Sequence, residues 1–182
     1  TFLLADVGKP GGRRSILSTL PLYTASRALL ERILDRHGVD PEQRETILKY
    51  ADDRRQRVAA ILENESLEDE LPMIAPEEFS AAPPVLELSG IFCETDISYS
   101  EEEYRAHLEE TYAFAAEHPN YTVRQSAMHA FRNLQILVHE DQWVMVSKSK
   151  APAIHFVIRH PKLRGAIENF IPPVTETDGP PA

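Results

Sequence analysis

Residues 133–170, NLQILVHEDQWVMVSKSKAPAIHFVIRHPKLRGAIENF, decide the fold of this chain. Apolar and polar residues alternate in two short segments around the polar residues 140–142, a pattern typical of antiparallel strands joined by a tight turn. Pro152 precedes a third alternating segment, and Pro161 stands at the first position of a helix, where its missing N–H costs nothing. The stretch therefore predicts strands at 133–139, 143–149 and 153–159 and a helix at 161–170.

The alternation assigns the side chains of these three strands to two faces. One face is apolar and carries Leu134, Ile136, Val138, Val144, Val146, Ile154, Phe156 and Ile158. We expect helices at 101–118 and 161–170 to cover it. The opposite face carries Gln135, Leu137, Trp143, Met145, Ser147, His155, Val157 and Arg159. A half-apolar face of this kind is typical of a docking surface or the wall of a ligand site, unless the N-terminal helices lie over it.

Helix boundaries are well marked elsewhere in the chain. Gly38 is placed to end a helix at 25–37, and Asp40 followed by Pro41 begins a second helix, which runs to residue 63. Ser100 and Glu103 form a capping box at the start of the helix at 101–118. Weaker patterns predict strands at 85–88 and 121–125 and a short helical turn at 67–71.

Together these elements predict an α+β fold, in which an N-terminal helical hairpin is followed by an antiparallel-rich sheet covered on one face by two helices. The Glu, Pro, Ala and Ser content of residues 76–84 indicates a linker. We therefore expect a helical segment at 1–75, an α/β sensor-like domain at 85–174 and a disordered tail at 175–182.

Composition indicates a globular protein of a reducing, aqueous compartment. Hydrophobic residues make up 42% of the chain and charged residues 26%, which is ordinary globular usage. The single cysteine, Cys93, excludes an internal disulfide, and no apolar run approaches the roughly 20 residues that span a bilayer. We expect a cytoplasmic location without membrane association.

Charge is unevenly distributed along the chain. The formal net charge of −10 argues against nucleic-acid binding by the chain as a whole. Residues 77–117 contain eleven acids and one base, whereas residues 124–164 contain seven bases and two acids. These two blocks either face each other inside the fold or across a dimer, or the basic block forms an anion-binding patch.

Motifs for catalysis or metal binding are weak. The segment GKPGGRRS lacks the spacing of a phosphate-binding loop, and no G-x-S-x-G elbow is present. The seven histidines are scattered without a metal-ligand spacing, so we expect no metal and no cofactor. Ser147 and His155 are expected on neighbouring strands, but no acid stands at a spacing that would complete a triad.

The strongest candidate site is an anion-binding patch near the third strand. Arginine and lysine beside a histidine suit a phosphate or carboxylate ligand. The predicted ligand-binding residues are Arg132, Trp143, Lys148, Lys150, His155 and Arg159.

The segments FRNLQI, VSKSKAPAIHFVIRHPKL and IENF resemble the region C-terminal to the DNA-binding domain in helix-turn-helix transcriptional regulators of the lambda-repressor-like class, from Gram-positive gut anaerobes. Helices 25–37 and 41–63 lack the short turn and the basic second helix of a DNA reader. The resemblance therefore implies a DNA-binding domain upstream of Thr1, and a chain that contacts DNA only through it.

Three functions are consistent with these observations. The first is a non-catalytic regulatory and dimerisation domain, a homodimer that senses a small anionic ligand. The second is a small hydrolase or transferase that acts on a phosphorylated substrate with His155 as acid or base. The third is a structural scaffold that uses the half-apolar sheet face to bind a partner.

Overall fold

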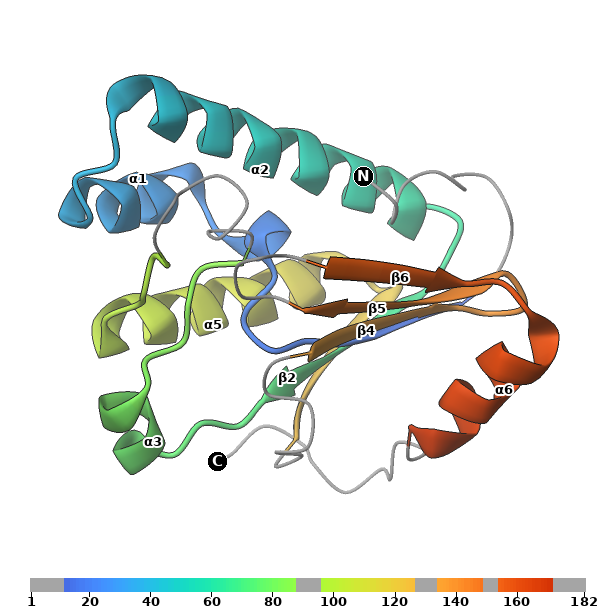
Figure 1. Cartoon of the computed structure of the whole chain (residues 1–182). Helices are drawn as coiled ribbons and strands as arrows, with labels where there is room; N and C mark the ends of the chain where they lie inside the picture. The colour runs from blue at the N-terminus through green and yellow to red at the C-terminus, as the bar shows by residue number, and fades with distance from the viewer. Residues whose placement is uncertain (1–11, 88–95, 127–133, 149–153, 172–182) are drawn as a thin grey trace.

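Six strands form one mixed sheet in a computed structural model that describes residues 12–87, 96–126, 134–148 and 154–171 (Figure 1). The strands are β1 (Arg13–Ile16), β2 (Leu67–Pro72), β3 (Tyr121–Ser126), β4 (Leu134–His139), β5 (Trp143–Lys148) and β6 (Ile154–Ile158). Their order across the sheet is β3-β2-β1-β4-β5-β6. β1, β2 and β3 are parallel, and β4, β5 and β6 extend the sheet as antiparallel neighbours. The fold is therefore α+β as expected, but the sheet is mixed rather than antiparallel-rich.

Two inner strands of the sheet, β1 and β2, were not expected from the sequence. The segment Leu67–Pro72 is a buried strand, so the helical turn predicted at 67–71 is wrong. β1 pairs with β2 on one side and with β4 on the other, and β2 pairs with β3. Strands from the predicted 1–75 segment and from the predicted 85–174 domain thus share one sheet. Within the predicted linker, residues Pro76–Ala81 form the short helix α3.

The strand and helix predictions for residues 134–171 are confirmed. β4 and β5 pair from Leu134↔Lys148 to His139↔Trp143, and β5 pairs with β6 with Val146 opposite Phe156. Asp141 has a φ of 57° in the connecting turn, a conformation that aspartate tolerates better than most residues. Helix α6 spans Pro161–Phe170 and starts with its proline, as expected.

The helices predicted at 25–37, 41–63 and 101–118 are also present, with slightly shorter bounds. They are α1 (Arg27–Arg36), α2 (Pro41–Leu62) and α5 (Glu101–Glu117), with a 3-10 turn, η2, at Leu22–Thr24. The Asp40 carboxylate accepts hydrogen bonds from the first turn of α2, and Ser100 and Glu103 form the capping box of α5. No helix among the described residues is long and apolar enough to cross a membrane.

Gly38 ends α1 in the left-handed region, with a φ of 64°. The Gly38→Ala variant is expected to lose about 1 kcal/mol in free energy of unfolding, because a Cβ disfavours this conformation. A Cβ there would meet nothing within 4 Å, so steric contact adds no further cost. Chemical denaturation at equilibrium measures the loss. An unchanged midpoint would contradict this assignment of backbone strain.

Helices cover both faces of the sheet, with α2 over one face and α6 over the other (Figure 1). On the α2 face, Phe114 of α5 packs with Leu67 of β2 and Tyr121 of β3. On the α6 face, Ile167 and Ile171 pack against a cluster that contains Ile16, Ile136, Val138 and Val144. The expectation that helices 101–118 and 161–170 share one face is therefore wrong. α5 covers the face opposite α6, because its apolar side packs on the parallel strands β2 and β3.

Candidate functional site

A buried aspartate stands at the centre of the α2 face. Asp69 of β2 is 1% exposed and accepts hydrogen bonds from the hydroxyls of Ser15, Tyr23 and Tyr121, the last at 2.8 Å. These four residues form the Asp69 cluster. Ser15 lies beside Asp69 in the β1–β2 register, Tyr121 begins β3, and Tyr23 comes from η2 above the sheet. The cluster therefore joins three strands to the layer that covers them.

Burial changes the titration of this cluster. It raises the pKa of Asp69, although the three hydroxyl donors act in the opposite direction. Burial and the neighbouring carboxylate also raise the pKa of Tyr23 and of Tyr121 well above the ordinary value. Both phenols therefore stay protonated and donate to Asp69. An aspartate with this set of donors is held in a fixed orientation.

A buried ion pair adjoins the Asp69 cluster. Arg54 of α2 lies 3.1 Å from Oε1 of Glu87, and both side chains are less than 10% exposed. Glu87 also accepts hydrogen bonds from the backbone N–H of Leu22, at 2.7 Å, and from Nε2 of Gln135, at 3.2 Å. The Arg54 guanidinium lies over the ring of Tyr23. This pair ties α2, η2 and β4 together.

A second ion pair lies at the end of the α2 face where β2 begins. Nε of Arg13 donates to Oε2 of Glu65 at 2.7 Å, and both side chains are buried. Nε2 of His139 is 4.0 Å from the same oxygen, and the His139 ring packs edge-on against Trp143. Trp143 is therefore part of this buried corner.

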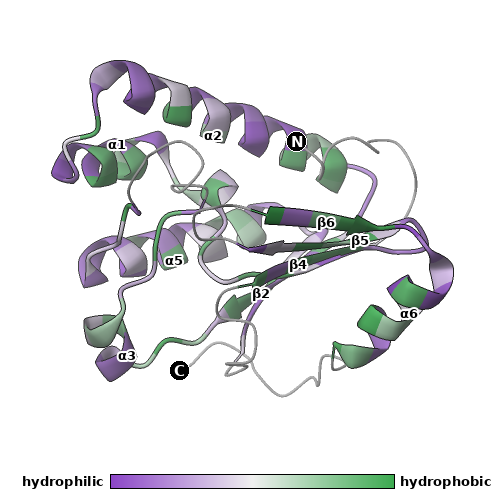
Figure 2. Cartoon of the chain, in the orientation of Figure 1, coloured by the Kyte–Doolittle hydropathy of each residue, from purple (hydrophilic) through white to green (hydrophobic). Residues whose placement is uncertain are grey.

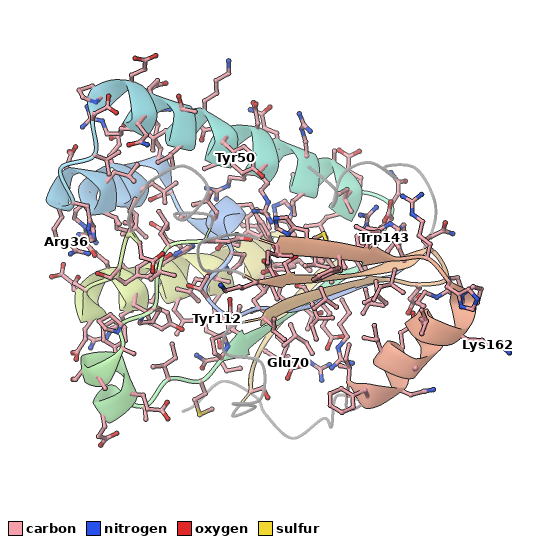
Figure 3. The ribbon with its side chains drawn as sticks, in the orientation of Figure 1. Arg36, Tyr50, Glu70, Tyr112, Trp143 and Lys162 are labelled. Carbon is pink, nitrogen blue, oxygen red and sulfur yellow. The ribbon has the colours of Figure 1, made fainter. Side chains whose placement is uncertain are left out.

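Only a small space remains between these polar groups. A cavity of about 20 Å³ is lined by both arginines, Asp69, Glu87 and Tyr23, with apolar side chains of α2 and β4 around them. A space of this size holds a single water molecule. Figure 3 shows side chains between α2 and the sheet. The three carboxylates of the α2 face are each bonded directly to donors of the chain, so this arrangement fixes the helical layer on the sheet.

The four predicted anion-binding residues that the structure describes are not gathered at one place. His155 lies on β6 and is exposed, and Arg159 follows the strand and is exposed. Lys148 has the strand parity of Val144 and Val146, which places it on the α6 face, opposite His155. Trp143 is buried at the other end of β5 (Figure 3). Arg132 and Lys150 lie outside the described residues.

Ser147 and His155 are in contact, as their neighbouring strands predicted. Nδ1 of His155 lies 2.8 Å from Oγ of Ser147. Ser147 is only 1% exposed, whereas a nucleophilic hydroxyl must be open to its substrate. The contact therefore orients the exposed imidazole rather than activating the serine. A hydrolase with this pair would need an accessible serine as well as the contact between Ser147 and His155, and only the contact is present.

Apolar side chains are exposed at the β6 edge of the sheet. Phe156 is 63% exposed and Ile154 is 45% exposed, and both lie on the α6 face. Leu163 of α6, one turn before Ile167, is also exposed. Figure 2 shows hydrophobic colouring along most of β6 and on α6. We name Ile154 and Phe156 the β6 patch.

The buried polar groups were missed by sequence reasoning. One signal was available for His107, which lies three residues after Tyr104 and four before Thr111, on the buried stripe of α5. Arg13 and Asp69 gave no comparable signal, because their charged neighbours resemble a surface segment.

Comparison of the chain with protein-family models, with curated proteins and with solved structures finds no match.

Proposed function

We propose that the chain is a non-catalytic regulatory domain that associates with another protein surface, as the dimerisation part of a transcriptional regulator does. The observation that carries this proposal is the β6 patch. Edge strands of monomeric proteins are normally short or protected by charged residues and proline. β6 instead exposes Phe156 and Ile154 at the margin of the sheet.

The buried polar groups support the same proposal. Asp69, Glu87 and Glu65 are each engaged by donors from elements that are distant in the sequence. Such a network holds α2, η2 and the sheet as one unit, which gives the β6 patch a rigid support. The acidic net charge fits a domain that leaves DNA contacts to another part of the protein. The anionic ligand expected from the sequence stays a prediction.

Sedimentation equilibrium over a range of concentrations tests the proposal. We expect the chain to self-associate, and Phe156→Asp to shift it towards the monomer, because a charge on the β6 patch would be desolvated on association. Met73→Asp is the matched control, since Met73 is 49% exposed after β2 and away from β6. A chain that stays strictly monomeric at high concentration would contradict the proposal.

A further inference from the structure

The outer edge of β6 differs from the other edge of the sheet. β3, at the opposite edge, carries Thr122 and Arg124, and Arg124 lies 3.8 Å from Glu68 of the neighbouring strand. β6 has the sequence IHFVI, without a fixed charge or a proline. Within the described residues β6 has a single strand neighbour, β5. Alternate residues of such an edge strand direct their N–H and C=O groups outward, where a further strand can pair with them.

The sequence of β6 is complementary to itself in the antiparallel direction. If two copies pair about a two-fold axis through Phe156, then Ile154 faces Ile158 of the second copy, and His155 faces Val157. The two Phe156 rings face each other. Aromatic and β-branched pairs of this kind stabilise antiparallel sheets, and no like charges are opposed within the strand. Registers centred one residue away leave one end of the strand unpaired.

The same axis also preserves the two faces of the sheet. A two-fold axis perpendicular to the sheet leaves the α6 face of one copy beside the α6 face of the other. Ile154, Phe156 and Ile158 of both copies then form one continuous apolar strip on that face. Phe156 already lies beside Val146, which packs on the buried cluster under α6. Association would therefore extend an existing core.

From this geometry we propose that the partner of β6 is the β6 strand of a second copy, paired antiparallel about Phe156 in a continuous twelve-stranded sheet. The inference rests on the proposed function, and it names the partner and the register. Symmetric pairing of one strand with itself is the simplest closed arrangement for a homodimer.

Disulfide trapping tests the register. Directly opposed residues of antiparallel strands have Cα atoms about 4.5–5.5 Å apart, within the range of a disulfide. In a Cys93→Ser background, Phe156→Cys is expected to form a covalent dimer under mild oxidation, seen as a doubling of mass on a non-reducing gel. His155→Cys and Val157→Cys are matched controls, expected to cross-link several-fold more slowly because neither residue faces itself in this register.

A mixture of Ile154→Cys and Ile158→Cys chains gives a second reading, because these two positions face each other across the axis. We expect the mixture to cross-link several-fold faster than either variant alone. Circular dichroism confirms that each variant is folded. A chain that dimerises in sedimentation but is trapped at other positions would overturn the inference and leave the proposed function intact. A chain that is monomeric at every concentration would overturn both.

Discussion

The Arg54→Met variant is expected to lose about 3–5 kcal/mol in free energy of unfolding, because it leaves the buried carboxylate of Glu87 without its cation. Glu87 is 5% exposed and, among the described residues, would keep two neutral donors, the N–H of Leu22 and Nε2 of Gln135. Methionine has a similar length to the aliphatic part of arginine. The loss in free energy of unfolding is therefore due more to the missing charge than to the change in side-chain volume. Urea denaturation at fixed protein concentration measures it.

Two further variants separate the ion pair from other effects of the Arg54 change. Arg57→Met removes an exposed arginine from the same helix and is expected to change stability by no more than about 0.5 kcal/mol. Glu87→Gln, combined with Arg54→Met, removes the buried charge but keeps an acceptor for Leu22. We expect the double variant to be more stable than Arg54→Met alone. An Arg54→Met protein as stable as Arg57→Met would show that Glu87 does not depend on its cation.

The sequence predicted best those elements that are specified by neighbouring residues. Asp40, Ser100 and Gly38 act within one turn of the helix boundaries that they mark, so their patterns give the helices almost to the residue. The β4–β5 hairpin follows in the same way from its alternation and its short turn. Local chemistry is sufficient in these cases, because the residues that stabilise each element lie inside it.

The inner strands β1 and β2 could not be predicted, because their charged residues are buried through partners that are distant in the sequence. β1 reads RRSI and β2 reads LEDELP, which resemble surface segments. Arg13 is stabilised by Glu65, 52 residues away, and Asp69 by Tyr23, 46 residues away. The position of α5 shows the same limit. Helical periodicity identifies the side of the helix that is buried, but not the sheet face that receives it.

The arrangement of the candidate site could likewise be predicted only in part from the sequence. Ser147 and His155 are expected on neighbouring strands, and they pair directly across β5 and β6. Lys148 is next to Ser147 in the sequence but lies on the other face, because a one-residue step along a strand reverses the face. Phe156 was expected in the core, and it is exposed because α6 covers β5 and leaves the margin of the sheet open. The exposure of Phe156 therefore depends on how α6 packs on the sheet. The alternation of residues along β6 does not predict that packing.

His107 joins α5 to η2 through hydrogen bonds of a neutral imidazole. Its ring is completely buried, and Nε2 lies 3.2 Å from the carbonyl oxygen of Pro21. A carbonyl only accepts, so Nε2 carries the proton. Nδ1 then accepts from the Tyr99 hydroxyl at 2.8 Å. Burial lowers the pKa of His107 from 6.5 to about 3, because the charged form would lose its hydration, although the hydrogen bond to the Pro21 carbonyl acts in the opposite direction.

Acid is therefore expected to destabilise the fold through His107. Between pH 6.5 and about 3 the unfolded chain binds a proton that the folded chain does not, so the free energy of unfolding falls as the pH is lowered through this range. At about 1.4 kcal/mol per pH unit, the full contribution is of order 3–5 kcal/mol. Urea denaturation at a series of pH values measures the slope.

The comparison of wild type with His107→Gln isolates this contribution, because other buried groups titrate in the same range. Burial raises the pKa of Asp69, which opposes the effect of His107, whereas the ion pair with Arg36 lowers the pKa of Glu103 and adds to it. His107→Gln is expected to be less stable at neutral pH, since Tyr99 and Pro21 lose their partner, but to lose less stability on acidification. His160→Gln, which removes an exposed histidine, controls for the change in composition. Parallel pH profiles for wild type and His107→Gln would show that the buried imidazole does not couple folding to protonation.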